Sequence, residues 1–192
     1  MQPQPKAGKE TLSSFRHLVD AVEAQIAGGH YDRAAGLCER ELEASPASVS
    51  VLELLTSVWE RGGRMERARE AAVRWATAAP LDPRAHYRLA LIEQRLQSYD
   101  WAVYRFRLAI AHAGADHALR VAAQDALHSL DAFQSRQVLA MRDVDPTFRA
   151  RLLADPERAL SERGFALSEE ARRALLSGLR RLPRGPRPPR PS

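Results

Sequence analysis

The chain has 192 residues and a mass of 21.4 kDa, with 45% hydrophobic and 28% charged residues, a globular composition that excludes a wholly disordered chain. A single cysteine excludes an intramolecular disulfide framework and a multi-thiolate metal site, and nothing in the composition implies a cofactor. The net charge of +5 is confined to the C-terminal tail, because residues 1–141 and 142–179 are each neutral.

The N-terminal residues are polar. The first ten include two prolines, and residues 1–12 are expected to be a disordered N-terminus and not a secretory signal. No apolar run in the sequence is long enough to cross a membrane. We therefore expect a cytoplasmic protein.

A 34-residue period runs through the first part of the chain. Ala34, Ala68 and Ala102 are each 34 residues apart, and Gly29 and Gly63 keep the same spacing. Each of these alanines follows a turn, a large apolar residue and an acid. Small residues at this position are expected where the two helices of a hairpin cross closely, so a large residue there overpacks the contact.

This repeat resembles the tetratricopeptide repeat (TPR) family, whose unit is a helix hairpin with such a hinge and a closing proline. The resemblance implies an all-α fold, a right-handed superhelix of three helix hairpins followed by capping helices and a small C-terminal helical segment. In the third unit Gln97 replaces the hinge glycine and Gly114 replaces the closing proline, which indicates decay of the repeat. The three units are residues 15–48, 49–82 and 83–116.

The segment after the repeats is expected to be helical as well. Residues 117–141 predict a capping helix or helix pair, which completes an array over residues 13–141. In residues 142–181, the pairs Asp145-Pro146 and Asp155-Pro156 each predict the start of a short helix, and a third helix begins at Ser168. The segment has too little apolar surface for an independent domain, so we expect it to pack on the end of the array, and the alternative is a mobile recognition module held by few contacts. Its expected contact residues are Phe148, Leu152, Leu153 and Leu160.

Residues 143–168 are similar to two further families. One is the small helical subunit of protocatechuate-type ring-opening dioxygenases, and the other is the leader region of nitrile-hydratase-like ribosomal peptide precursors. The resemblance implies a pair of short helices. It carries over no catalytic residue, because the dioxygenase chemistry resides in a different subunit.

Candidate catalytic and metal-ligating residues are few. Cys38 lies where the repeat places a core residue, which predicts a buried structural thiol. His117 and His128 share a helix face with Asp125 near them, but zinc ligands are usually closer in sequence, so we expect a solvated polar face and no metal. We expect no catalytic residue and no enzymatic activity.

In the TPR family the first helix of each hairpin lines a concave groove, and the resemblance implies a partner-binding site there. Some members hold a chaperone tail with a lysine and asparagine clamp, but Val19 and Glu23 stand at the corresponding positions, which argues against that ligand. A peptide is expected to meet the Tyr87 ring and Leu91 between flanking arginines. The expected groove residues are Arg16, Glu23, Glu53, Glu60, Arg61, Arg84, Tyr87, Leu91, Gln94 and Arg95.

Two functions stay open. The first is a protein-binding adaptor or co-chaperone, of the kind that includes secretion chaperones, which holds a peptide or partner helix in the groove. The second is an accessory or precursor protein of a ribosomal-peptide maturation or ring-cleavage system, recognised through its C-terminal helices. Residues 182–192 predict a disordered tail rich in proline and arginine, and weak nonspecific contact with polyanions is expected there. The cations expected to make it are Arg180, Arg181, Arg184, Arg187 and Arg190.

Overall fold

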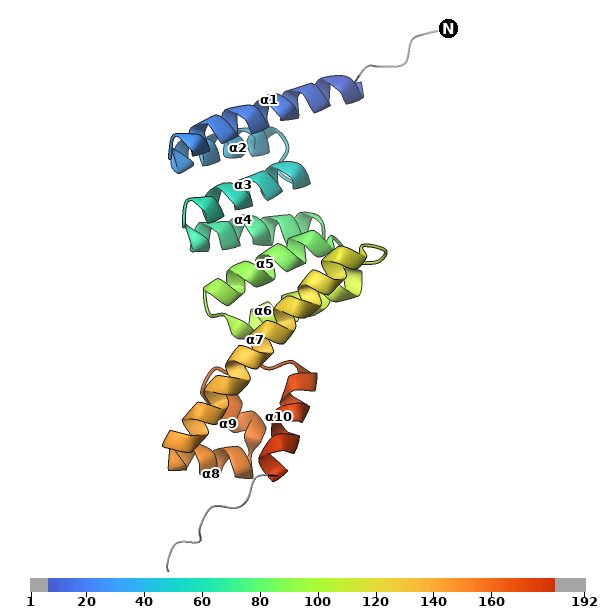
Figure 1. Ribbon diagram of the computed structural model, residues 1–192. Helices are drawn as coiled ribbons and strands as arrows, with labels where there is room; N and C mark the ends of the chain where they lie inside the picture. Colours follow the sequence, from blue (N-terminus) through green and yellow to red (C-terminus); the bar gives the residue numbers. More distant parts are fainter. Residues whose placement is uncertain (1–6, 182–192) are drawn as a thin grey trace, which may run out of the picture.

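The computed structural model describes the backbone of residues 7–181 and the side chains of residues 14–179. All the regular structure in that part of the chain is helical, which confirms the all-α prediction (Figure 1). None of the described helices is long and apolar enough to span a membrane. The helices are α1 (Ala7–Ala27), α2 (Tyr31–Ala44), α3 (Val49–Arg61), α4 (Met65–Ala78), α5 (Pro83–Arg95), α6 (Tyr99–His112), α7 (His117–Val144), α8 (Pro146–Ala154), α9 (Pro156–Glu162) and α10 (Glu169–Arg181).

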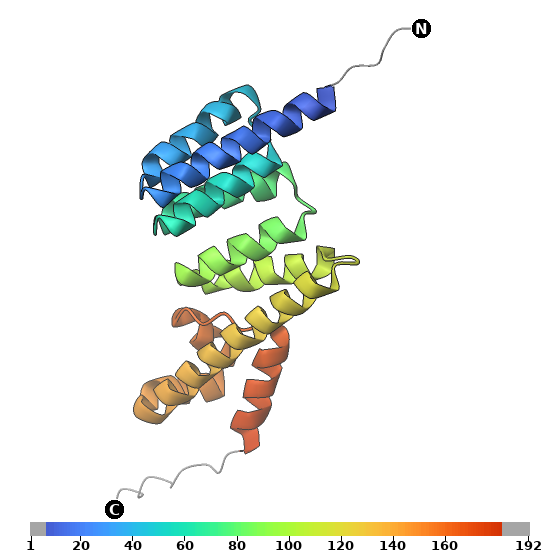
Figure 2. The same cartoon turned by 45° about the horizontal axis from the view of Figure 1, so that its top comes forward.

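The first six helices form three hairpins, α1–α2, α3–α4 and α5–α6, which stack in chain order as the 34-residue period predicts (Figures 1 and 2). The hinges adopt the same left-handed backbone conformation, with φ of 74° at Gly29, 70° at Gly63 and 59° at Gln97. Glycine adopts this region without steric cost, whereas glutamine does not. The third hinge therefore keeps the turn of the repeat although it has lost the glycine.

The repeated alanines lie at the centre of the hairpins. Ala34, Ala68 and Ala102 each have no exposed surface. Ala34 and Ala68 belong to one apolar core that joins α1 to α5, and Ala102 belongs to a second core formed by α5, α6 and the first half of α7. Residues of α5 contribute to both cores, so each hairpin buries its apolar face against a neighbour, as repeat units that cannot bury these faces alone require.

We expect Ala68→Leu to lower the free energy of unfolding by about 1–3 kcal/mol, because the added side chain has no space between α3 and α4. Glu70→Leu is the control, since Glu70 is exposed on the same helix and its replacement is expected to change stability by less than about 0.5 kcal/mol. Urea unfolding followed by circular dichroism measures both variants. Equal stability of the two would show that the hairpin crossing tolerates a large residue.

The helix α7 differs from the expected capping helix in length. It continues as one helix from His117 to Val144, so the expected boundary after residue 141 falls inside it. Its first half packs on α5 and α6 as the first helix of a fourth unit would, and its second half carries α8, α9 and α10 (Figure 1). One continuous helix therefore belongs to both parts of the molecule.

The short C-terminal helices begin where the sequence predicts. The Asp145 carboxylate accepts hydrogen bonds from the backbone N–H groups of Thr147 and Phe148, both at 2.9 Å, and Asp155 accepts one from Arg158 N–H at 3.2 Å. These bonds satisfy N–H groups that a helix start leaves without partners. The bond from the Phe148 N–H, then that from the Thr147 N–H, and finally the adjacent Arg163 guanidinium lower the pKa of the Asp145 carboxyl group.

The C-terminal helices form a core of their own with the second half of α7. This C-terminal core consists of Val138, Phe148, Leu152, Ala159, Leu160, Leu175 and Leu179. The main apolar contact of residues 142–181 is therefore with α7, and the contacting residues Val138, Leu139 and Met141 lie in the expected capping helix at the end of the array. Leu153 was expected in the buried surface and is 65% exposed, so that assignment was wrong.

Two buried polar side chains of α7 fix the segment between α9 and α10. Gln134 has no exposed surface, and its side-chain amide bonds both backbone groups of Ala166, donating to the carbonyl at 2.7 Å and accepting from the N–H at 2.8 Å. The Asp131 carboxylate accepts from the N–H and the hydroxyl of Ser168, at 2.8 and 2.6 Å. These four hydrogen bonds hold the start of α10 in place.

Candidate functional site

The first helices of the three hairpins carry a ladder of ion pairs on their shared face. Arg61 of α3 reaches Glu23 of α1 with an Nη1–Oε1 distance of 2.8 Å. On the next step, Arg84 of α5 lies 3.7 Å from Glu53 of α3. The structure therefore brings together side chains from α1, α3 and α5 that the TPR resemblance implied to share one face.

Glu60 of α3 is the most enclosed carboxylate of this ladder, with 9% of its side chain exposed. It pairs with Arg88 and, at 3.5 Å, with Arg95. Sequence reasoning missed Arg88. The signal was present, since Arg84, Arg88 and Arg95 follow one another at intervals of four and seven residues along one face of α5.

The apolar side chains of the expected groove are partly buried against the rest of the protein. Tyr87 and Leu91 are half-buried and pack against the second core, and the Tyr87 ring lies 6.1 Å from that of Phe106 between centroids. Gln94 is also half-buried, and Arg16 is exposed on α1. The surface that is open on these helices is therefore mainly charged, with a narrow apolar strip at Tyr87 and Leu91.

This face carries more arginines than glutamates, and the two kinds of side chain differ in exposure. Its arginines on α3 and α5 keep 43–58% of their side chains exposed, whereas the Glu60 carboxylate that two of them share is nearly enclosed. Exposed ion pairs contribute little to stability. Arg84 and Arg95 are the most exposed of the set, with 57% and 58% of their side chains exposed.

Cys38 is fully buried in the core between α1 and α5, as expected for a structural thiol. Burial, and then the neighbouring Glu39 carboxylate, raises the pKa of the thiol to about 11. At neutral pH almost none of it is present as the thiolate, which is the nucleophilic form.

We expect the Cys38 thiol of the folded chain to react with a disulfide reagent at pH 8 about 100-fold more slowly than in urea, because both access and thiolate fraction are reduced. The absorbance of released thiolate measures the two rates. A native rate close to the unfolded rate would show that the core around α2 opens readily.

The histidines do not form a metal centre in the part of the chain that the structure describes, where no three or more His, Cys, Asp or Glu side chains are grouped around a possible ion. His117 and His128 are both exposed on α7. His86 is buried, and its Nε2 lies 2.8 Å from the carbonyl oxygen of Pro80, so it serves the loop between α4 and α5. Burial lowers the pKa of its imidazole.

No protein-family model and no curated protein matches this sequence. Solved structures do match the fold. PcrH from Pseudomonas aeruginosa shares 19% identity with a TM-score of 0.54, covering 67% of this chain and 95% of that chain. The Yersinia enterocolitica type III secretion translocator chaperone SycD shares 15% identity with a TM-score of 0.54, covering 67% and 99%.

A further match is PcrH in complex with the chaperone binding region of PopD, with 21% identity, a TM-score of 0.54, and coverage of 61% of this chain and 90% of that chain. At this level of identity the likeness establishes the architecture. The hairpin array is a TPR-like superhelix. The C-terminal resemblance to dioxygenase subunits and peptide leaders gains no support from any of these comparisons.

The expected polyanion site cannot be placed on the structure. Arg184, Arg187 and Arg190 lie outside the described residues, and the side chains of Arg180 and Arg181 do as well.

Proposed function

We propose that this chain is a non-catalytic cytoplasmic adaptor or chaperone that holds a peptide or helix of a partner protein on the face formed by α1, α3 and α5. The observation that carries this proposal is the ladder of exposed, ion-paired side chains that three successive hairpins present on one surface. A partner with carboxylates replaces some of these pairs with its own, while Tyr87 and Leu91 offer the apolar contact.

Two further facts support the proposal. The similar chaperone PcrH has been solved with the chaperone binding regions of PopD and PopB, so the same architecture holds partner segments in another protein. The thiol of Cys38, which the sequence predicts to be structural, is buried, and burial raises its pKa to about 11. A binding role agrees with both facts.

The proposal is tested by photo-cross-linking in the cells that produce the protein. Benzoylphenylalanine is placed at Ser57 of α3 or Gln94 of α5, both half-exposed on the proposed surface, and in control variants at Glu70 of α4 or Arg107 of α6, both exposed on the second helices. We expect one partner protein to be cross-linked from Ser57 and Gln94 and not from the controls. Charge reversal of Arg84 and Arg95 to glutamate is expected to reduce the yield several-fold.

Cross-linking of the same protein from all four positions, or from the control positions alone, contradicts the proposal. So does a yield that is unaffected by the charge reversal. Thermal unfolding of each variant is measured in parallel, because the reversal also removes the pairs to Glu53 and Glu60.

We expect the tail to add weak polyanion contact independent of this surface. Deleting residues 182–192 removes three arginines and leaves α10 intact, so elution from a heparin column is expected at lower salt. Replacing the three arginines with glutamine tests the charge alone and is expected to have the same effect. Unchanged elution of both variants would show that the tail makes no such contact.

A further inference from the structure

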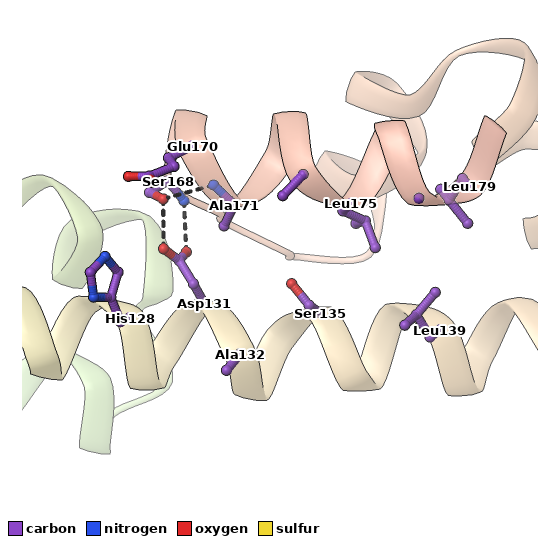
Figure 3. A pocket seen from close by; sticks show the side chains of 12 residues that line it. His128, Asp131, Ala132, Ser135, Leu139, Ser168, Glu170, Ala171, Leu175 and Leu179 are labelled. Atoms are coloured by element: carbon purple, nitrogen blue, oxygen red, sulfur yellow. Dashed lines mark hydrogen bonds between the residues drawn. The ribbon is translucent and has the colours of Figure 1, made fainter. Parts of the chain in front are cut away.

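An open groove of about 590 Å³ lies between the second half of α7 and α10. Figure 3 shows the two helices running side by side, with His128, Ala132, Ser135 and Leu139 on one wall. The residues from His128 to Leu139 span about 16 Å at the helical rise, which is three turns. The groove therefore has the length of a short helix.

Hydrogen bonds and apolar packing fix the positions of the two helices that form this groove. Asp131 accepts both hydrogen bonds of Ser168 at one end, as Figure 3 shows, and Leu175 and Leu179 are anchored in the C-terminal core. Two small residues of α10, Ala174 and Gly178, line the groove beside these leucines. Ala174 and Gly178 are exposed, and a Cβ added at Gly178 meets no atom within 4 Å. The space is thus preformed and unfilled in this chain.

The groove continues the surface of the proposed function. Val121, Asp125 and His128 of α7 lie 34 residues after Tyr87, Leu91 and Gln94 of α5, so the repeat register places them on the same face. That α7 packs beside α5 agrees with this register. His128 lines the groove as well, and is therefore the residue at which one surface passes into the other.

The charge changes sign at this junction. Glu170 lines the groove and Asp125 precedes His128 by three residues, and neither has an ion-pair partner among the residues whose side chains are described. The arginines that face α1 and α3 give way here to these two acids. Beyond them the lining becomes apolar, at Leu139, Leu175 and Leu179.

We propose that the partner bound on the α1–α3–α5 face extends into the α7–α10 groove with a helix of about three turns. The aliphatic face of this helix covers Ala174 and Gly178, and a lysine or arginine of the helix meets Glu170. This inference rests on the proposed function and names a second part of the same partner. The acid at Glu170 and the continuity of the two surfaces favour this occupant, and a second copy of the chain is the alternative outcome of the test.

The test uses the full chain with benzoylphenylalanine at the exposed position Ala132 or Ala174, beside the variant carrying it at Ser57. We expect the groove positions to cross-link the same protein as Ser57, at a neighbouring segment of its sequence. A synthetic peptide with that segment's sequence is then titrated against purified chain, with fluorescence anisotropy as the readout.

The matched variants locate the peptide. Gly178→Trp fills the groove and is expected to weaken binding at least tenfold, whereas Gly178→Ala enters open space and leaves it unchanged. Glu170→Lys is expected to weaken binding about fivefold, and Glu169→Lys, which makes the same charge change outside the groove, is expected to have no effect. Equal effects within either pair of variants overturn the inference.

The cross-links separate the two proposals. A partner cross-linked from Ser57 together with no product, a different protein or a second copy of this chain from Ala174 overturns the groove inference and leaves the proposed function standing. No product from any of these positions, or a product from the groove positions alone, overturns both.

Discussion

Leu152→Ala is expected to lower the free energy of unfolding of the C-terminal helices by about 2–5 kcal/mol, whereas Leu153→Ala changes it by less than about 0.5 kcal/mol. The two residues are adjacent in α8 and chemically identical. Leu152 is 1% exposed within the C-terminal core, and Leu153 is 65% exposed. Truncating the first leaves a cavity among few remaining side chains, while truncating the second removes surface that water already reaches.

Urea unfolding with NMR detection of the Phe148 and Leu160 resonances measures both variants, because these residues report the C-terminal core separately from the repeats. The resonances of Ala68 in the first core serve as an internal reference and are expected to shift little. Equal destabilisation by the two substitutions would show that α8 packs with a different face than the structure assigns. Loss of the repeat core in step with the C-terminal core would show that the molecule unfolds as one unit.

The prediction for Leu153 was wrong because the start of a helix depends on neighbouring residues, whereas the face that a helix buries depends on distant parts of the chain. Asp145 and Asp155 fix where α8 and α9 begin through bonds to N–H groups two or three residues away, which a short sequence pattern reveals. Which leucine of α8 turns inward depends on where α7 and α10 lie. That information is spread over distant parts of the chain.

The repeat array was more accessible to prediction. The TPR resemblance implied that Glu23 and Arg61 line the same face of α1 and α3, although it did not predict the ion pair that joins them. The unbroken length of α7 also had a signal, because residues 117–144 contain neither glycine nor proline. No sequence pattern indicated the groove between α7 and α10. Ala132 and Ala174 both line it because the segment between α9 and α10, which Gln134 binds, places α10 beside α7.

Gln134→Ala is expected to destabilise the C-terminal helices by about 2–4 kcal/mol, because the backbone N–H and carbonyl of Ala166 lose, at a buried site, the partners they have within the described part of the chain. Gln134→Met separates this effect from a cavity, since it keeps the side-chain volume and removes both hydrogen bonds. We expect the two variants to be nearly equally destabilised. Gln137→Ala, at an exposed position one turn further along α7, is the control and is expected to have little effect.

Amide hydrogen exchange supplies the local readout. In both Gln134 variants the amides of Ala166 and Ser168 are expected to exchange faster than in the unaltered chain, because the segment between α9 and α10 is released from α7. The N–H of Ser168 has its own partner in Asp131, so its exchange reports movement of the whole segment and not the lost bond alone. A Gln134→Met variant with unaltered stability and exchange would show that α10 is positioned by its leucines, and that the polar contacts merely follow.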